Sequence, residues 1–422
     1  MGSIRPEPAV HSTNPSRVEE TTITELAPRG FGVARVEGKV LFVPLTAPGD
    51  LIRFRVTDDH GRYAFADLVE LLRPGGSRSA SFCRVFGECG GCQLQHVSYA
   101  AQVEAKRAWV REAFRRIAKV DMVVDPVIVS PALVGYRNKA TIHVGSGVAG
   151  FLQAQSRRIV SATSCPMLET PLREILEAIG EWAAAAPPDQ SFRVVLRRGT
   201  EGDPLVVVHD CNRPGALEAL ARTLPEARVV RPGSRAAVTF RCQGVRFEAQ
   251  AETFFQINAH QFDGMISVLS DLLPSGGVLV DGHAGVGWPS LCLASRFRRV
   301  VCVEIAVRAC QFGSANAQRA GFGHVSFCRG SLASAERRGE LPRDPDAALV
   351  DPPRAGLLPH DLTALANTRV PVIVYVSCDP ATQARDVARL GAYGYEVVRV
   401  IPFDLFPHTA HVESIALLNL RR

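Results

Sequence analysis

The sequence predicts a multidomain α/β chain of three folded parts: a small β-barrel, an α+β middle domain and a C-terminal doubly wound α/β domain. The length of 422 residues exceeds one ordinary domain, and 46% hydrophobic residues exclude disorder throughout. Short alternating runs broken by glycine fill residues 21–72. From about residue 247 strand-like runs alternate with helical ones, which is typical of βαβ units and a mainly parallel sheet.

The N-terminal half contains four kinds of segment, in chain order. Residues 1–16 are rich in Pro, Ser and Arg and lack periodicity, so we expect a disordered tail there. The strand-like runs of residues 21–72 predict the barrel. Apolar residues at helical spacing over 99–117 predict a helix whose basic residues lie mostly off the apolar stripe. Residues 125–245 mix strand-like segments with one helical stretch near 170–185, which predicts an α+β domain.

Seven strand-like runs mark the C-terminal part: GGVLVDG, VVCVEI, HVSFCRG, AALVD, PVIVYVSC, YEVVRVIPF and VESIALLNL. Helical stretches separate most of them. A doubly wound sheet binds its ligand at the carboxyl ends of its strands. We therefore expect the functional residues to follow directly after these runs.

The positive charge is concentrated in one part of the chain. The net charge is +6, and residues 101–160 hold ten basic against four acidic residues. This excess predicts a phosphate-contacting surface; the alternative is a solvated basic helix face. No apolar run approaches the length of a membrane span, and the N-terminus lacks a secretory signal, so we expect a cytoplasmic protein without membrane contact.

The first strand of the C-terminal part ends in an acid and a glycine-rich turn. Asp281 is followed by Gly285 and Gly287, and Glu304 ends the next strand 23 residues after Asp281. Glycines let the backbone approach a nucleotide, and an acid after the second strand can bond ribose hydroxyls. The spacing predicts an adenosine-containing ligand.

Two later strands deliver the candidate catalytic groups. Asp351-Pro352-Pro353-Arg354 looks like the D-P-P-[YFW] loop of amino-methyltransferases, but its arginine makes an exocyclic amine a less expected target. Cys378 ends the next strand near a helix N-terminus, which we expect to lower its pKa and make it a nucleophile; the alternative is a buried structural cysteine. A carboxylate near the mouth of the last strand, in FPHTAHVES, can remove a proton.

The cysteine pattern indicates a metal site. Eleven cysteines without a signal sequence argue against a disulfide framework. Cys83, Cys89 and Cys92 are closely spaced, and Cys165 follows much later. Four such thiols fit zinc or a [4Fe-4S] cluster equally well, and a site without metal is the alternative.

In combination these motifs resemble the RNA (uracil-5-)-methyltransferases, and among them the bacterial 23S rRNA type that carries a TRAM domain and an iron-sulfur cluster. The resemblance covers nearly the whole chain, in the family's order. It rests on GFGVARVEGKVLFVPLTAPGD, CRVFGECGGCQLQH with SCPML, YRNK, FFQIN, DPPRAGL, VSCDPATQARD and FPHTAHVES.

The resemblance implies a TRAM RNA-binding barrel (OB-like) at 17–75, a central α+β iron-sulfur and RNA-binding domain at 76–245, and a Rossmann-like class I methyltransferase domain at 246–422. The helix near 99–118 is expected to pack on the catalytic domain. The implied metal group is a [4Fe-4S] cluster on Cys83, Cys89, Cys92 and Cys165.

For catalysis the resemblance implies that Cys378 is the nucleophile and Glu413 the base. The residues expected to hold S-adenosyl-L-methionine are Gln256, Asp281, Gly285, Gly287, Glu304 and Asp351. The residues expected to hold the RNA and its flipped base are Phe254, Pro352, Pro353, Arg137 and Lys139.

Two alternatives differ from methylation of 23S rRNA, and no obligate protein partner is expected in any of them. One is methylation of the T-loop uridine of tRNA, as in relatives. The other is a non-catalytic RNA-binding or redox iron-sulfur protein on a methyltransferase scaffold. It is motivated by three departures from the family pattern: His283 and Trp288 stand in the first glycine loop, and Ser331 follows the third strand.

Overall fold

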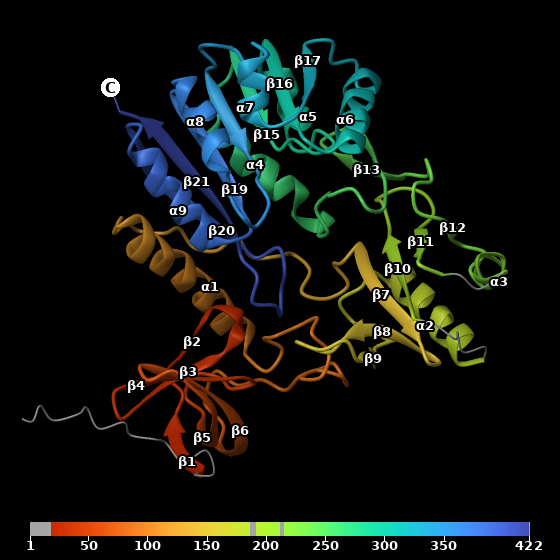
Figure 1. Cartoon of the computed structure of the whole chain (residues 1–422), viewed down its shortest axis with the longest axis vertical. Helices are drawn as coiled ribbons and strands as arrows, with labels where there is room; N and C mark the ends of the chain where they lie inside the picture. Colours follow the sequence, from red (N-terminus) through yellow and green to blue (C-terminus); the bar gives the residue numbers. More distant parts are fainter. Residues whose placement is uncertain (1–17, 186–190, 212–214, 422) are drawn as a thin grey trace, which may run out of the picture. The chain divides into compact units, whose positions relative to one another are not determined.

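The computed structural model describes residues 18–185, 191–211 and 215–421 (Figure 1). The tail expected at residues 1–16 lies outside these residues. The chain divides into two compact units. The first holds the described residues up to Phe82 together with Gln93–Ala105, and the second holds Cys83–Cys92 and the chain from Lys106 onward. Across the described ranges, every helix is too short or too polar to cross a membrane.

The first unit is a six-stranded sheet around a small apolar core. Its strands are β1 (Val18–Thr22), β2 (Glu25–Leu26), β3 (Gly32–Val36), β4 (Lys39–Val43), β5 (Leu51–Asp59) and β6 (Tyr63–Arg73). They pair in the order β1-β5-β6-β4-β3-β2, and β4 and β6 run parallel. Alternate residues such as Ile52 and Phe54 point into the core. The small all-β domain predicted here is confirmed.

Helix α1 (Tyr99–Ala113) begins in the first unit and ends in the second. It continues as a wider π-helical turn over Phe114–Ala118, which ends at Lys119 with φ 58°. Val110 and Phe114 are fully buried in one apolar cluster with Val387 and other residues of the C-terminal domain. The end of the predicted helix therefore packs on that domain, as expected.

The middle of the chain folds as a second sheet. Its strands pair in the order β12-β11-β10-β7-β8-β9, and helix α2 packs its apolar stripe into their core. The bounds are β7 (Lys139–Gly145), β8 (Val148–Leu152), β9 (Ile159–Ser161), α2 (Thr170–Ala185), β10 (Phe192–Arg197), β11 (Leu205–His209), α3 (Ala216–Thr223) and β12 (Arg228–Val230). A separate hairpin follows, β13 (Val238–Cys242) and β14 (Val245–Ala249); the domain boundary expected at 246 falls within it.

The C-terminal part is a seven-stranded, mostly parallel sheet in the order β17-β16-β15-β18-β19-β21-β20. All seven predicted strands are present: β15 (Val278–Gly282), β16 (Arg299–Glu304), β17 (Val325–Arg329), β18 (Ala347–Val350), β19 (Val372–Ser377), β20 (Tyr395–Phe403) and β21 (Glu413–Leu420). The helices are α4 (Phe262–Leu272), α5 (Ser290–Leu293), α6 (Val307–Arg319), α7 (Leu332–Arg337), α8 (Pro359–Asn367) and α9 (Pro380–Gly391). Strand β21 runs antiparallel to both of its neighbours.

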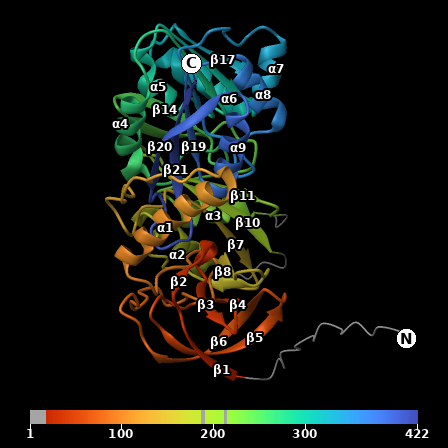
Figure 2. The same ribbon diagram turned by 90° about the vertical axis from the view of Figure 1, so that its left-hand side faces the viewer.

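Helices cover both faces of this sheet, as its apolar strands require. Helices α4 and α5 lie on one side and α8 and α9 on the other (Figure 2). Alternate residues of each strand enter separate clusters, so that Leu279 packs with α4 and α5 while Val280 packs with α8 and α9. The predicted doubly wound domain is confirmed.

Candidate active site

Four acids and one cysteine lie at the carboxyl edge of the parallel strands. Strand β15 lies between β16 and β18, so Asp281, Glu304 and Asp351 come from three adjacent strand ends. Strand β21 starts at Glu413 and runs against β19, whose end precedes Cys378. These residues were predicted to lie at one edge of the sheet, and the strand order brings them together there.

Glu304 holds the glycine-rich turn in place. Its carboxylate accepts the backbone N–H of Gly285 at 2.8 Å and that of Ala306 at 2.6 Å. Gly285 and Gly287 have φ values of 57° and 95°, which favour glycine. A Cβ on Gly287 would come within 2.8 Å of a Leu291 side-chain atom, whereas one on Gly285 would meet nothing within 4 Å. The turn therefore leaves room beside Gly285 for a ligand, and the neighbouring acids fit the positively charged S-adenosyl-methionine.

Asp281 is buried beneath this turn. Burial raises the pKa of its carboxyl to about 8; the hydrogen bond from Ser290 opposes the shift, and nearby Asp351 and Glu304 add to it. Burial also raises the pKa of Asp351. These acids are close enough to affect one another's charge. Such a group suits a methyl donor that carries positive charge on its sulfonium and amino groups.

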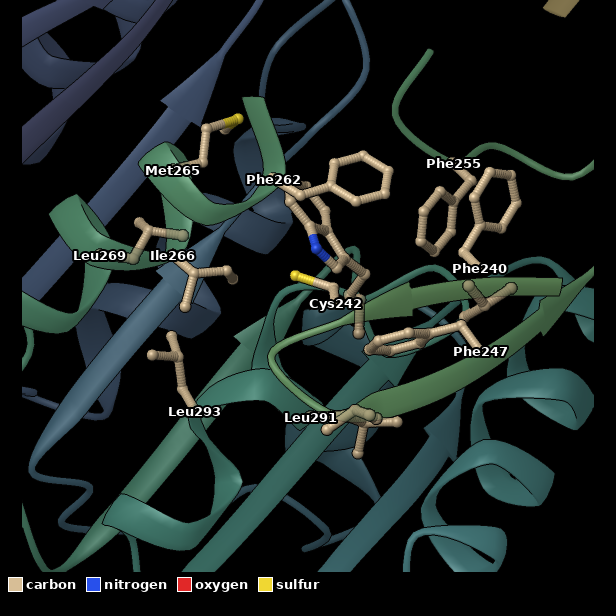
Figure 3. Close-up of a cluster of buried hydrophobic side chains, with 14 of the residues drawn as sticks. Phe240, Cys242, Phe247, Phe255, Phe262, Met265, Ile266, Leu269, Leu291 and Leu293 are labelled. Carbon is tan, nitrogen blue, oxygen red and sulfur yellow. The ribbon is translucent and has the colours of Figure 1, made fainter. Parts of the chain in front are cut away.

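The two residues that depart from the family pattern in this turn have different surroundings. Trp288 is 7% exposed and lies in an aromatic cluster, with ring centroids 5.9 Å from Phe255 and 5.4 Å from Phe262. That cluster joins β13, β14, α4 and α5 (Figure 3). His283 adopts φ 64°, its Nε2 is buried without a hydrogen-bond partner, and burial lowers its pKa. Trp288 is thus part of the core, while His283 keeps a neutral ring in the turn.

Cys378 and Glu413 are cross-strand neighbours, because the preceding Ser377 pairs with Ser414. The thiol pKa of Cys378 is raised to about 11, first by burial and then by Glu413. The expectation that the nearby helix N-terminus would lower this pKa is wrong. Burial and the acid outweigh the N-terminus of α9, whose first N–H groups are already bonded to Asp379.

Arg354 is a functional candidate that the sequence argument did not assign. Its guanidinium lowers the pKa of Cys378, both by its charge and by a hydrogen bond, and so opposes the rise that burial causes. It also opposes the rise in the pKa of Glu413 that burial and Asp351 cause. The same side chain lies 3.3 Å from Nδ1 of His411. The only sequence signal was the arginine that replaces the aromatic residue of the D-P-P-[YFW] loop.

The expected base-holding residues differ in exposure. The Phe254 ring is 64% exposed, Gln256 is 3% exposed, Pro352 is buried and Pro353 is exposed. The backbone carbonyl of Gln256 accepts the side-chain amide of Asn138 at 3.2 Å. Their assignments to the base and the cofactor stay predictions.

The two cations expected to contact RNA lie against other parts of the chain. The Arg137 guanidinium donates to the carbonyl of Gly91 at 3.0 Å. Lys139 Nζ lies 3.4 Å from the carbonyl of Glu252. Burial, followed by Arg197, lowers the pKa of Lys139 to about 8. Their role in RNA binding stays a prediction.

The four expected ligand cysteines belong to the second unit. Burial, followed by Cys92 and Cys83, raises the pKa of Cys89, and burial, followed by Cys92 and Cys89, raises that of Cys165, so the thiols are near one another. Burial raises the pKa of Cys165 to about 11, and Cys92 and Cys89 raise it further; the Met167 N–H and Arg137 oppose this. None of the four cysteines forms a disulfide. In the described ranges no three His, Cys, Asp or Glu side chains are grouped as they would be around a metal ion. The donor atoms therefore fit an iron-sulfur cluster in kind and neighbourhood, but they do not form a closed ligand set.

Comparison with known proteins adds two family matches. Residues 343–421 match the tRNA (Uracil-5-)-methyltransferase family, and residues 14–69 match the TRAM domain. An RNA methyltransferase of Thermosynechococcus vestitus, described as uncharacterized, is 35% identical over 95% of this chain and 97% of its own length. One from Synechocystis sp. is 32% identical over 95% of this chain and 96% of its own.

A solved structure is similar over almost the whole chain. It is the Pyrococcus abyssi tRNA (uracil-54, C5)-methyltransferase in complex with S-adenosyl-L-homocysteine. The TM-score is 0.74 at 26% identity, and the match covers 95% of this chain and 100% of the other.

Proposed function

The chain belongs to the RNA (uracil-5-)-methyltransferase family, and from this premise we propose that it methylates uracil C5 through a covalent bond between Cys378 and C6. The enzyme uses S-adenosyl-methionine and acts on RNA. The observation that carries the mechanism is the cross-strand placement of Cys378 beside Glu413 at the edge that holds the cofactor acids.

The chemistry explains why both side chains are needed. Uracil C5 is too weak a nucleophile to take a methyl group unaided, and addition of a thiolate to C6 converts the ring to an enolate with an electron-rich C5. When bound, S-adenosyl-methionine supplies the methyl group to that carbon. Glu413 then removes the C5 proton, the C5–C6 double bond re-forms, and the Cys378 thiolate leaves.

Arg354 fits this scheme as the cation that stabilises the thiolate. Burial raises the pKa of the resting thiol, and the positive charge of Arg354 favours the thiolate that forms when the thiol proton passes to water. The target base must leave its stack to reach this edge. We assign Phe254, Pro352 and Pro353 to hold the flipped ring, with Gln256 beside it.

Replacement of Glu413 by Gln tests the mechanism directly. E413Q should accumulate a protein–RNA adduct that survives denaturing electrophoresis, because the thiol adds but cannot be eliminated. Removal of Cys378 from the same variant, as C378A/E413Q, should abolish the adduct. If E413Q turns over like the wild type and traps no RNA, the roles given to both residues are wrong.

We further propose 23S rRNA as the substrate, supported by the TRAM domain and the four cysteines, a combination that resembles the rRNA type. A tRNA substrate is the second candidate, because the solved relative is named for uracil 54 of tRNA. Cells that lack the gene should lose 5-methyluridine from one of the two RNAs. Complementation with wild type but not C378A should restore it, and a loss confined to tRNA would refute the rRNA assignment.

The first unit offers a surface suited to unpaired RNA bases. Phe31, Phe42 and Phe65 lie with ring centroids 5.5 to 6.5 Å apart. Tyr63, which is 40% exposed, stacks on His60 at 4.6 Å. Aromatic rings stack on bases without sequence preference. We propose that this patch holds a single-stranded part of the RNA.

We also propose that Cys83, Cys89, Cys92 and Cys165 close around a [4Fe-4S] cluster with a structural role. The shared environment of the thiols and the N–H donor of Gly91, 3.4 Å from Cys89 Sγ, support it. Anaerobically purified protein should contain iron and acid-labile sulfide, and C89S should lose both while C211S keeps them. Zinc in the purified protein without acid-labile sulfide would mean that the four cysteines bind zinc instead of the cluster.

A further inference from the structure

The loop between β20 and β21 leads directly into Glu413, the first residue of β21. It spans residues 404–412, and several of its side chains are inaccessible: Asp404 and Thr409 have no exposed surface and Leu405 has 1%. A connection buried to this degree must have its backbone polar groups satisfied by the protein. The partners of those groups therefore determine where the loop, and with it the catalytic base, lies.

Three consecutive carbonyls of this loop accept hydrogen bonds from three distant side chains. The Asn258 amide donates to Leu405 at 3.0 Å, Lys106 Nζ to Phe406 at 3.0 Å, and the Tyr136 hydroxyl to Pro407 at 2.9 Å. All three donors are buried. The loop is thus fixed at three successive residues from segments that precede it by more than a hundred residues.

Lys106 differs from the other two donors because it is charged. Its Nζ lies 2.6 Å from Asp404 Oδ1, and neither side chain has any exposed surface. The same Asp404 oxygen accepts the backbone N–H of Phe406 at 3.2 Å. The ammonium therefore joins the first residue of the loop to the third. A buried charge keeps its partner strictly in place, because separating the two leaves an unpaired ion out of water.

Cys378 lies outside this loop, after β19 and before α9. Gln383 of α9 donates to the carbonyl of Tyr375 in β19 and to that of Ser414 in β21. These two hydrogen bonds involve neither Lys106 nor the 404–412 loop. Loosening of the 404–412 loop should therefore displace the base more than the nucleophile.

We infer that Lys106, paired with Asp404, is a positioning residue that holds the 404–412 loop so that the Glu413 carboxylate reaches the C5 proton. This inference rests on the proposed covalent mechanism. Proton removal requires the base within hydrogen-bond distance, and small displacements are costly in rate. Loss of the pair should slow elimination more than addition, so the enzyme should stall as the covalent adduct.

The test compares K106M with K106M/D404L. The single variant removes the ammonium from the buried Asp404 carboxylate and should lower the melting temperature. The double variant replaces the ion pair with apolar side chains of similar size, which restores stability in comparable cases. Both should turn over at least about tenfold more slowly, with the KM for RNA changed by less than about twofold. Both should accumulate adduct, and K106R should recover part of the turnover.

Two controls separate the possible failures. R337M removes a positive charge from an exposed position at the end of α7 and should trap no adduct. E413Q reports the mechanism itself. If E413Q traps RNA and K106M/D404L does not, the positioning role is refuted, whereas absence of adduct in E413Q refutes the mechanism. If K106M/D404L melts at the wild-type temperature and also turns over at the wild-type rate, Lys106 only stabilises the fold. That result would refute the inference.

Discussion

The thiols of Cys378 and Cys165 have similar pKa values but different neighbouring groups. Both are half-buried, and burial is the main cause that raises the pKa of each thiol to about 11. An arginine at each site opposes this rise in pKa: Arg354 does so at Cys378 and Arg137 at Cys165. The pKa of the thiol alone therefore does not distinguish the proposed nucleophile from the proposed metal ligand.

The neighbours of the two thiols do distinguish them. Cys378 faces a carboxyl, Glu413, that can take up a proton. Cys165 lies near other thiols, Cys92 and Cys89, which can share a metal but cannot act as a base for uracil. The pairing of a thiol with an acid is suited to proton transfer, and a group of thiols is suited to ligation.

Alanine in place of each cysteine should give the largest contrast. C378A should reduce methylation of RNA to background, since no other group in the proposal adds to C6. C165A should keep most of its activity per folded molecule but lose iron and melt at a lower temperature. Transfer of a labelled methyl group, thermal melts and iron analysis measure the three properties. Near-normal methylation by C378A would show that Cys378 is not the nucleophile.

The pH dependence of the methylation rate should further distinguish the role of Cys378 from that of Cys165. Below the pKa of about 11 of Cys378, the thiolate fraction rises about tenfold for each pH unit. Glu413 must also be ionised to remove a proton, and its pKa is raised, so both groups predict a rate that increases with pH. The single-turnover rate should therefore climb from about pH 7 to about pH 9, until another step limits it. C165A should show the same slope as wild type, and a flat profile would contradict the raised pKa values of Cys378 and Glu413.

Residues at strand ends could be placed from the sequence because position at a parallel edge follows from order along the chain. Asp281, Glu304, Asp351 and Cys378 each end or follow a strand whose apolar run is plain in the sequence. Sheet topology then brings them to one edge. Local patterns sufficed for this part of the site.

Long-range contacts could not be predicted in this way. Lys106 and Asp404 are 298 residues apart, and nothing near either residue in the sequence indicates a buried pair. Trp288 stood in a ligand-binding turn by pattern, but the β13–β14 hairpin and α4 supply aromatic partners that draw it into the core. Arg137 belonged to a basic stretch, yet its guanidinium bonds to Gly91. Charge counts give the amount of charge in a segment but not the direction of its side chains.

Exchange of the two arginines for glutamine should produce a smaller effect. R354Q removes the cation that favours the Cys378 thiolate. Because Arg354 is exposed, solvent weakens its influence, and we expect the single-turnover rate near neutral pH to fall by about threefold to tenfold. Higher pH should recover part of the loss. R137Q should leave this profile unchanged and lower the iron content instead, and a pH shift in R137Q would mean that the sites are coupled.

The smallest expected effect concerns stability and a second group of the catalytic edge, Asp281. Its pKa is raised from 3.8 to about 8. For an acid whose pKa is higher in the folded protein, the contribution to stability is complete below the unfolded pKa and is lost as pH rises through the folded value. The cofactor-free wild type should therefore lose free energy of unfolding between about pH 5 and about pH 8, where the folded carboxyl keeps its proton and the unfolded one is ionised, on the order of 1 kcal/mol per pH unit at most.

In D281N the amide stays neutral over this range, and its oxygen can still accept the hydrogen bond from Ser290. Urea unfolding at both pH values should accordingly show a flatter dependence for D281N than for wild type. C165A should retain the wild-type dependence, because a thiol with a pKa of about 11 stays protonated over nearly the whole interval. Equal slopes in D281N and wild type would mean that Asp281 is already ionised in the folded protein, and the cationic methyl donor would then meet a charged carboxylate from the start.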